Sequence, residues 1–165
     1  MNINRIVKHL LTTHWQVDRA FPRDTLVAIA QAINVCESDH VGELRFAVEG
    51  ALHSASLLHG QSARDRAIEV FSQLRVWDTE HNNGVLIYVL LADRAVEIVA
   101  DRGVHARVGG PQWEAICRAM EAAFQHTEYR DGAINGIQAV AQHLKEHFPA
   151  YRNGQNELSD TPVVL

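Results

Sequence analysis

The sequence predicts an α/β fold in which a mixed β-sheet of three to four strands lies between helices on both faces, as a three-layer sandwich. An uninterrupted apolar run at 85–91 is typical of a central strand that is covered on both sides. Alternating apolar and polar residues at 44–49 indicate a half-buried strand before it. The helix expected between them makes this pair parallel, with a right-handed crossover. Residues 92–94 are too few for a second crossover, so 95–101 should return antiparallel as a hairpin.

The first part of the chain supplies helices on either side of the first strand. An apolar pattern over 3–15 predicts a short amphipathic helix that covers either the sheet or a partner, and the pattern leaves both open. A second helix is expected over 26–37, with Pro22 near its first turn. The connection 50–61 carries its own leucines and should pack against the body. Ser62 is expected to cap the helix that follows, which ends near Trp77-Asp78.

Two more helices follow the hairpin. Gly109-Gly110-Pro111 interrupts the chain before a helix with apolar residues from Trp113 to Phe124 on one face. A last helix buries a stripe between Ile134 and Leu144, and Pro149 ends it. We therefore expect a lead-in with the amphipathic helix at 1–19, one α/β domain at 20–148, and a flexible tail at 149–165.

Composition and charge exclude several classes of protein. The chain has 165 residues, with fifteen Lys and Arg against twenty Asp and Glu, so its net charge of −5 argues against nucleic acid and against an anionic membrane as partners. No apolar stretch approaches the roughly 18 residues that a bilayer requires, so we expect no membrane insertion. The two cysteines lie at helical spacing among apolar residues and form no disulfide framework. A cytoplasmic protein is expected, and the oligomeric state stays open.

The predicted hairpin brings polar side chains from two distant stretches to one edge of the sheet. If Asp93-Arg94 is a two-residue turn, the ladder places Asp101 opposite Leu86, beside the loop 78–83 that precedes the central strand. Hard oxygen ligands of this kind suit Ca²⁺ or Mg²⁺, and a guanidinium beside them suits a phosphate. The candidate metal ligands are Asp78, Glu80, Asn82 and Asp101, and the candidate phosphate ligand is Arg102. The simpler interpretation is that Asp78 and Asn82 only make turn hydrogen bonds.

Two other signals are interpreted structurally. Trp77 follows a helix, where a tryptophan more often closes the core than stacks on a ligand. His143 and His147 match the order of an inverted zincin motif, but zinc needs a third protein ligand, and in the short tail after them Glu157 alone could serve. We interpret this pair as part of a solvated last helical turn.

A combination of motif residues runs through the centre of the chain. They are Trp77, Asn82, Asn83, Gly84, Asp93, Arg94 and Gly103, with Phe124, Tyr129, Gly132 and Gly136 further on. This combination resembles the TPM domain family over about residues 20–148. The resemblance implies a mixed sheet between helices. It also implies relatives described as thylakoid-lumen acid phosphatases linked to photosystem repair, as calcium binders or as assembly factors, and it places this chain in a bacterial branch without leader or membrane anchor.

The chain departs from the family pattern at one acidic position. Relatives show Gly-Tyr-Gly followed by an acid, whereas here Asp101-Arg102-Gly103 is followed by Val108-Gly109-Gly110. Either Asp101 supplies the missing charge from a new position or the site is lost. We therefore favour a protein-interaction or assembly module, with a protein partner at a membrane complex as one setting and with the sheet edge and the Leu57-Leu58 connection as its surface. The alternative is a metal-assisted phosphatase-like hydrolase that uses Ca²⁺ or Mg²⁺ at Asp78 and Asp101.

Overall fold

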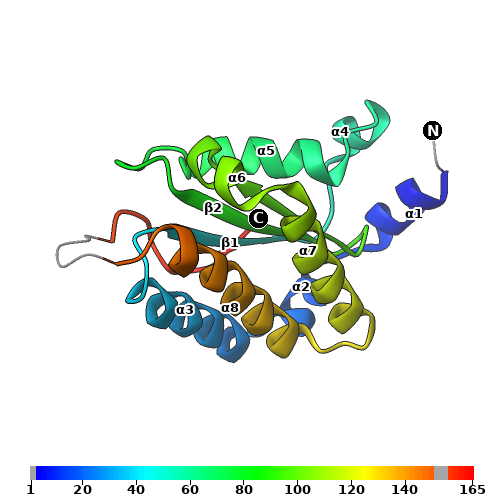
Figure 1. Ribbon diagram of the computed structural model, residues 1–165. Helices are drawn as coiled ribbons and strands as arrows, with labels where there is room; N and C mark the ends of the chain where they lie inside the picture. Colours follow the sequence, from blue (N-terminus) through cyan, green and yellow to red (C-terminus); the bar gives the residue numbers. More distant parts are fainter. Residues whose placement is uncertain (1–2, 151–155) are drawn as a thin grey trace.

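The centre of the molecule is a four-stranded mixed sheet in the order β3-β2-β1-β4, seen in a computed structural model that describes residues 3–150 and 156–165 (Figure 1). β1 pairs in parallel with both β2 and β4, and β2 pairs antiparallel with β3. The strands are β1 (Glu43–Glu49), β2 (Gly84–Leu90), β3 (Ala95–Ala100) and β4 (Val163–Val164). The predicted α/β class with a mixed sheet is therefore confirmed.

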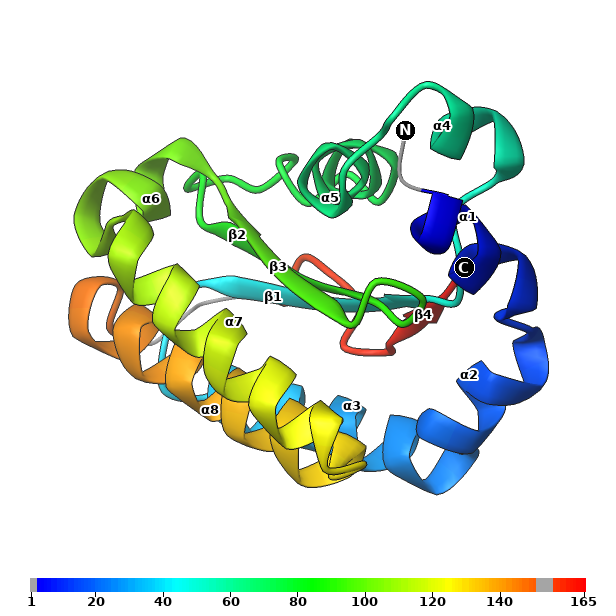
Figure 2. The ribbon, with the colours of Figure 1, turned by 90° about the vertical axis from the view of Figure 1, so that its right-hand side faces the viewer.

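Helices cover both faces of this sheet, as a three-layer sandwich requires (Figure 2). One face carries α4 (Ser54–Leu58) and α5 (Ala63–Gln73). The other carries α2 (His14–Ala20), α3 (Arg23–Glu37), α6 (Arg102–Val108), α7 (Gly110–Gln125) and α8 (Tyr129–His147). The first helix, α1 (Ile3–Leu11), contacts α4 at the side of the molecule. No helix within the described part of the chain combines the length and apolarity that crossing a membrane demands.

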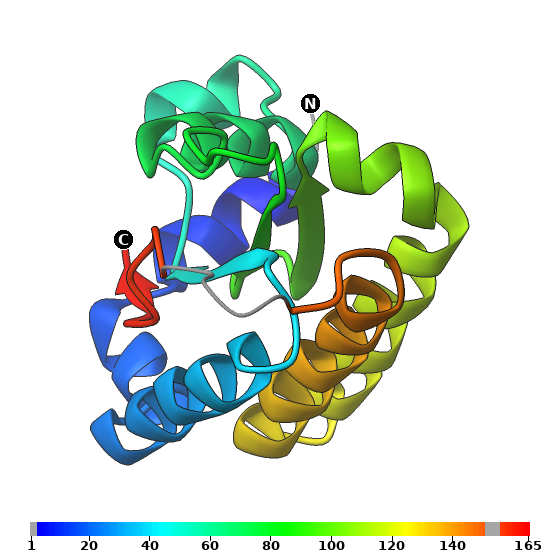
Figure 3. The same cartoon turned by 60° about the vertical axis from the view of Figure 1, so that its left-hand side comes forward.

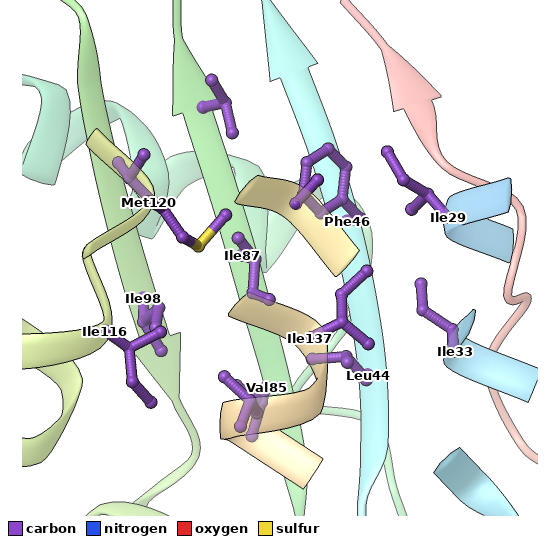
Figure 4. Close-up of a cluster of buried hydrophobic side chains, with 14 of the residues drawn as sticks. Ile29, Ile33, Leu44, Phe46, Val85, Ile87, Ile98, Ile116, Met120 and Ile137 are labelled. Atoms are coloured by element: carbon purple, nitrogen blue, oxygen red, sulfur yellow. The ribbon is translucent and has the colours of Figure 1, made fainter. Parts of the chain in front are cut away.

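The alternation of side chains along the strands divides the core into two clusters. On β1 and β2, Leu44, Phe46, Val85 and Ile87 face α3, α7 and α8, where they meet side chains such as Ile137 (Figure 4). The alternate residues of β2, among them Leu86 and Leu90, face α5. All seven residues of β2 are buried, as expected of a strand without alternation.

The hairpin forms, but its register differs from the predicted one. Leu90 pairs with Ala95, because the turn spans the four residues 91–94 instead of two. Arg94 closes this turn with φ of 53°, and its N–H donates to the Leu91 carbonyl at 3.0 Å. The prediction that Asp101 lies opposite Leu86 was wrong by two positions, since the Asp101 N–H donates to the Gly84 carbonyl. A shift of two keeps every side chain on its predicted face.

The two ends of the chain are more structured than predicted. The single helix expected over 3–15 is two helices, because Thr13 begins α2 in a capping box with Gln16. At the other end, the flexible tail expected at 149–165 is, in its described part 156–165, laid along β1 (Figure 3). Val163 and Val164 form β4, and the Leu165 N–H donates to the Val48 carbonyl at 2.9 Å. Residues 151–155 of the predicted tail lie outside the described residues.

Candidate functional site

The structure brings the two predicted stretches to the same edge of the sheet. The Asp101 N–H donates to the Gly84 carbonyl at 2.8 Å, where β3 ends beside the start of β2. Gly103, at the start of α6, packs so closely on the loop that a Cβ there would lie 2.6 Å from the Asn82 carbonyl oxygen. Residues about twenty positions apart are therefore neighbours, although the register is not the predicted one.

Two polar groups at this edge make structural hydrogen bonds, whereas the buried Asp101 Oδ2 has no hydrogen-bond partner in the described part of the chain. The Asp101 carboxylate accepts the Arg102 N–H at 2.6 Å and so caps α6, and the Glu80 N–H donates to the Glu157 carboxylate at 3.0 Å. Asp78, Asn82 and the Arg102 side chain are exposed. Among residues 3–150 and 156–165, no three His, Cys, Asp or Glu side chains are arranged to hold a metal ion. The carboxylates of Asp78, Glu80 and Asp101 therefore form no such cluster, and a Ca²⁺ or Mg²⁺ site at this edge stays a prediction.

The Asn82-Asn83-Gly84 motif joins the starts of β1 and β2. Asn83 is fully buried; its N–H donates to Thr79 Oγ1 at 3.1 Å, its carbonyl accepts the Glu43 N–H at 3.1 Å, and its Nδ2 donates to the Val41 carbonyl. A Cβ at Gly84 would overlap the Val76 carbonyl oxygen. These contacts explain the motif by packing and backbone hydrogen bonds.

Trp77, next to this loop, does not close the core. Its side chain is 51% exposed, whereas Val76 beside it is fully buried in the cluster under α5. The prediction of a core tryptophan was wrong because the helix ends at Gln73 and the next turns carry Val76 inward instead.

At the opposite edge of the sheet, the hairpin turn anchors the N-terminal helix. Asp93 accepts hydrogen bonds from Arg5 Nη2 at 2.7 Å and Arg5 Nε at 3.0 Å, and its Oδ1 lies 2.9 Å from His9 Nε2. His9 Nδ1 accepts the Leu52 N–H at 3.0 Å, so Nε2 carries the proton that His9 donates to Asp93. Burial alone would raise the pKa of Asp93, but the hydrogen bonds from Arg5 and His9 outweigh it and hold that pKa below its ordinary value.

This anchor turns α1 so that its polar side faces the body of the protein and its apolar side faces outward. His9 is buried and Arg5 is half-buried, whereas Ile3, Leu10 and Leu11 are 67–68% exposed. Val7 completes this surface, which we call the α1 apolar face and define as Ile3, Val7, Leu10 and Leu11. The sequence showed that the helix is amphipathic, but its inward side is set by Asp93, 84 to 88 residues away.

A buried carboxylate also lies at the end of β1, where it is fully used by the fold. Glu49 Oε2 accepts the Tyr88 hydroxyl at 2.7 Å and Arg66 Nε at 2.8 Å. Burial first, and then the Glu49 charge, raises the pKa of Tyr88 well above its ordinary value. Glu49 and Arg66 therefore form a buried ion pair under α5 that also binds the Tyr88 hydroxyl. None of the three side chains is available as a general acid or base.

A third polar group holds the C-terminal segment on β1. The Glu43 carboxylate accepts the Glu157 N–H at 3.2 Å and the Leu158 N–H at 3.0 Å, and Arg45 donates to the Ser159 carbonyl. Glu37 accepts the Leu44 N–H at 3.0 Å nearby. Burial raises the pKa of Glu37 to about 8, and the nearby Glu43 and Asp160 carboxylates add to this rise. The hydrogen bond from the Leu44 N–H lowers the pKa but does not outweigh them.

Neither cysteine is an activated nucleophile. Burial, followed by the nearby Glu97 carboxylate, raises the pKa of Cys117 to about 12. Burial and the neighbouring acids Asp39 and Glu37 also raise the pKa of Cys36. Both thiols are therefore protonated at neutral pH, which suits a packing role.

Comparison with known proteins gives one family match and several similar solved structures, two of which are described below. The family model of the TPM domain matches residues 18–143. The chain is similar to the BA42 protein of the psychrophilic bacterium Bizionia argentinensis, solved by NMR, with 28% identity, a TM-score of 0.75, and coverage of 86% of this chain and 92% of that one. A weaker similarity links it to the N-terminal domain of a P. gingivalis protein, also solved by NMR, with 18% identity, a TM-score of 0.48, and coverage of 73% and 94%. Among curated proteins none matches the chain.

Proposed function

This chain belongs to the TPM domain family, and from that premise we propose that it is an interaction module that joins a larger assembly through the α1 apolar face. One observation carries the proposal: α1 exposes its apolar side and turns its polar side to the protein. An isolated apolar side chain on a surface is ordinary, but four on one short helix indicate a binding site. Leu58, on the neighbouring α4, is 65% exposed and adds apolar surface at this end.

The competing proposal is a metal-assisted phosphatase-like hydrolase at the edge that carries Asp78 and Asp101. Its support is that the loop 78–83 and the start of α6 are neighbours. The geometry favours it less, because Asp101 caps α6 and the Glu80 backbone is bound to Glu157. Within the described part of the chain, Asp101 Oδ2 is buried without a hydrogen-bond partner, but no three His, Cys, Asp or Glu side chains gather there, so we favour the interaction module.

The proposed setting of the module is the cytoplasm. Cys36 and Cys117 are both free thiols, which agrees with a reducing compartment. A cytoplasmic module with an apolar docking helix fits the expected place at a membrane-associated complex.

The interaction role is tested by separating free from assembly-bound protein in extracts of cells that express the full chain. We expect the wild type to sediment with larger material on a density gradient and a Leu10→Asp, Leu11→Asp double variant to stay in the free fraction. The matched control is Val35→Asp on α3, whose side chain is as exposed as that of Leu11, at 68%. This control should sediment like the wild type, because it leaves the α1 apolar face intact.

Two results would contradict the proposed function. One is a wild-type chain found wholly in the free fraction, with a distribution equal to that of the double variant. The other is hydrolysis of a phosphate ester by the purified chain with Mg²⁺ or Ca²⁺ that is lost in Asp101→Ala but retained in Leu10→Asp, Leu11→Asp, which would establish the hydrolase instead.

A further inference from the structure

We propose that the α1 apolar face binds the surface of an anionic lipid bilayer, as a peripheral contact that does not span it. This inference rests on the proposed function and names the partner for the same surface. It follows from the position of the helix, from an exposed tryptophan a few residues after it, and from an uneven distribution of charge.

The position of α1 suits contact with a broad surface. The helix lies at the outer side of the molecule beside α4 and the hairpin turn at the end of the sheet, away from α3 and α8 (Figures 1 and 2). Arg5 and His9 hold it there through Asp93, so the α1 apolar face stays outward and Lys8 is exposed beside it. A helix of this kind lies in the plane of a membrane interface, with its apolar side sunk about 5–10 Å into the boundary between headgroups and acyl chains.

Trp15, in α2 a few residues after α1, is a further exposed apolar side chain. Its indole is 65% exposed, and the Arg19 guanidinium lies 5.5 Å from the ring centre. Tryptophan prefers the headgroup level of a bilayer, where its ring is apolar and its N–H meets water. A guanidinium beside it supplies a positive charge at the same level. Trp15 and Arg19 therefore provide the kind of anchor pair that an interfacial helix uses.

The charge of the chain is negative overall but positive over its first 23 residues. Residues 1–23 hold four Lys or Arg and one acid, Asp18, whereas the rest of the chain holds eleven Lys or Arg and nineteen acids. Arg5 is paired with Asp93, and Lys8, Arg19 and Arg23 are exposed. The net charge of −5 opposes approach to an anionic membrane, but the uneven distribution of charge turns the positive N-terminal segment toward such a surface.

The same charges disfavour a second copy of the chain on this face. α1 contains Arg5, Lys8 and His9 but no carboxylate. Two α1 helices packed on each other would bring their lysines to the rim of the contact with no acid on either helix to pair them. An anionic surface complements Lys8, so the observations favour lipid over self-association.

The test uses the purified full chain and vesicles of two compositions. One is phosphatidylcholine alone, and the other is phosphatidylcholine with an equal part of phosphatidylglycerol. We expect the chain to cosediment with the anionic vesicles only, and binding to weaken as salt is added. The Leu10→Asp, Leu11→Asp double variant should lose affinity by at least about tenfold, because two leucine side chains no longer enter the bilayer. Val35→Asp should bind like the wild type.

A change in fold would not imitate this result. The replaced leucines are exposed, so the double variant should keep the wild-type thermal unfolding midpoint. No binding of the wild type to anionic vesicles would overturn the inference, and so would equal binding by the double variant.

The failure of this inference is distinguishable from failure of the proposed function. If vesicles do not bind the chain but the double variant still leaves the larger fraction of the extract, the face binds a protein and the lipid assignment is wrong. If gel filtration shows that the wild type and Val35→Asp are dimers and the double variant is a monomer, the α1 apolar face is a dimer interface. The lipid assignment is then also wrong.

Discussion

Glycine 84 is the residue at which the start of β2 tolerates no side chain. A Cβ there would overlap the backbone carbonyl of Val76, which has no freedom to move aside as a flexible side chain would. We predict that Gly84→Ala lowers the free energy of unfolding by about 2–4 kcal/mol, measured by urea denaturation. Gly110→Ala is the matched control, since nothing lies within 4 Å of a Cβ at Gly110, and it should change stability by less than about 0.5 kcal/mol. Equal stability of the two variants would show that the Val76 backbone moves aside to accommodate the added Cβ at little cost.

Glu37 makes stability depend on pH in an unusual direction for a carboxyl group. Its pKa rises from 4.5 to about 8 on folding, so between these values the native protein holds a proton that the unfolded chain releases. Stability from this group therefore falls as pH rises through that window, instead of rising. We predict that Glu37→Gln, which keeps an acceptor for the Leu44 N–H, raises the unfolding midpoint at pH 8 by a few degrees and leaves it unchanged below pH 4.5.

The check is a series of thermal unfolding curves of wild type and Glu37→Gln from pH 4 to pH 8.5. The difference between the two midpoints isolates Glu37 from the other acids, such as Glu43, whose pKa burial also raises. Glu114→Gln, at an exposed position on α7, serves as the control and should give a curve parallel to that of the wild type. Parallel curves for Glu37→Gln would mean that Glu37 is ionised in the native protein.

At the scale of elements, α1 depends on one carboxylate in the turn between β2 and β3. Asp93 is charged at neutral pH because its pKa lies below the ordinary value, so its anchoring effect is present at neutral pH and is lost only as acid titrates that lowered pKa. We predict that Asp93→Asn, which breaks the paired contact with Arg5, increases hydrogen exchange of the α1 amides about 5- to 30-fold, the factor for 1–2 kcal/mol.

The exchange of β2 amides should stay the same in Asp93→Asn, because α1 packs on α4 and not on the sheet core. Asp18→Asn, at an exposed position on α2, is the matched substitution and should leave α1 unchanged. If the α1 amides exchange at the same rate in Asp93→Asn and in Asp18→Asn, the Asp93 contacts do not hold the helix.

Elements with a strong period were predicted well, and short ones were not. The apolar run of β2 was enough to predict that strand, and Ser62 begins α5 in a capping box with Asp65, as expected. The alternation of β1 predicted the strand but not its burial: β1 was expected to be half-buried, and all seven of its residues are buried, because its polar side chains Glu43, Arg45 and Glu49 are paired inside the fold.

β4 has only two residues, too few to show a hydrophobic period in the sequence. It is a strand only because Val163 and Val164 pair with the edge of β1. The hairpin register failed for a related reason: one left-handed residue, Arg94, selects a four-residue turn.

At the scale of the whole molecule, sequence order predicted which stretches meet but not how their side chains are used. The loop 78–83 and Asp101 are neighbours because the topology makes them so. Whether an acid is a ligand or a helix cap depends on hydrogen bonds such as that from Arg102 N–H to Asp101, which no spacing reveals. The orientation of α1 was equally hidden, since Arg5 and Asp93 are 88 residues apart.

The C-terminal segment on β1 also governs how the folded molecule behaves at high concentration. β1 hydrogen-bonds to β2 on one side and to β4 and Leu165 on the other, so its outer backbone groups are already satisfied near Ala47 and Val48. An unpaired strand edge can hydrogen-bond to a strand of another molecule and so start aggregation. Residues 163–165 already pair with this edge of β1, so we expect it to be closed to strands of other molecules.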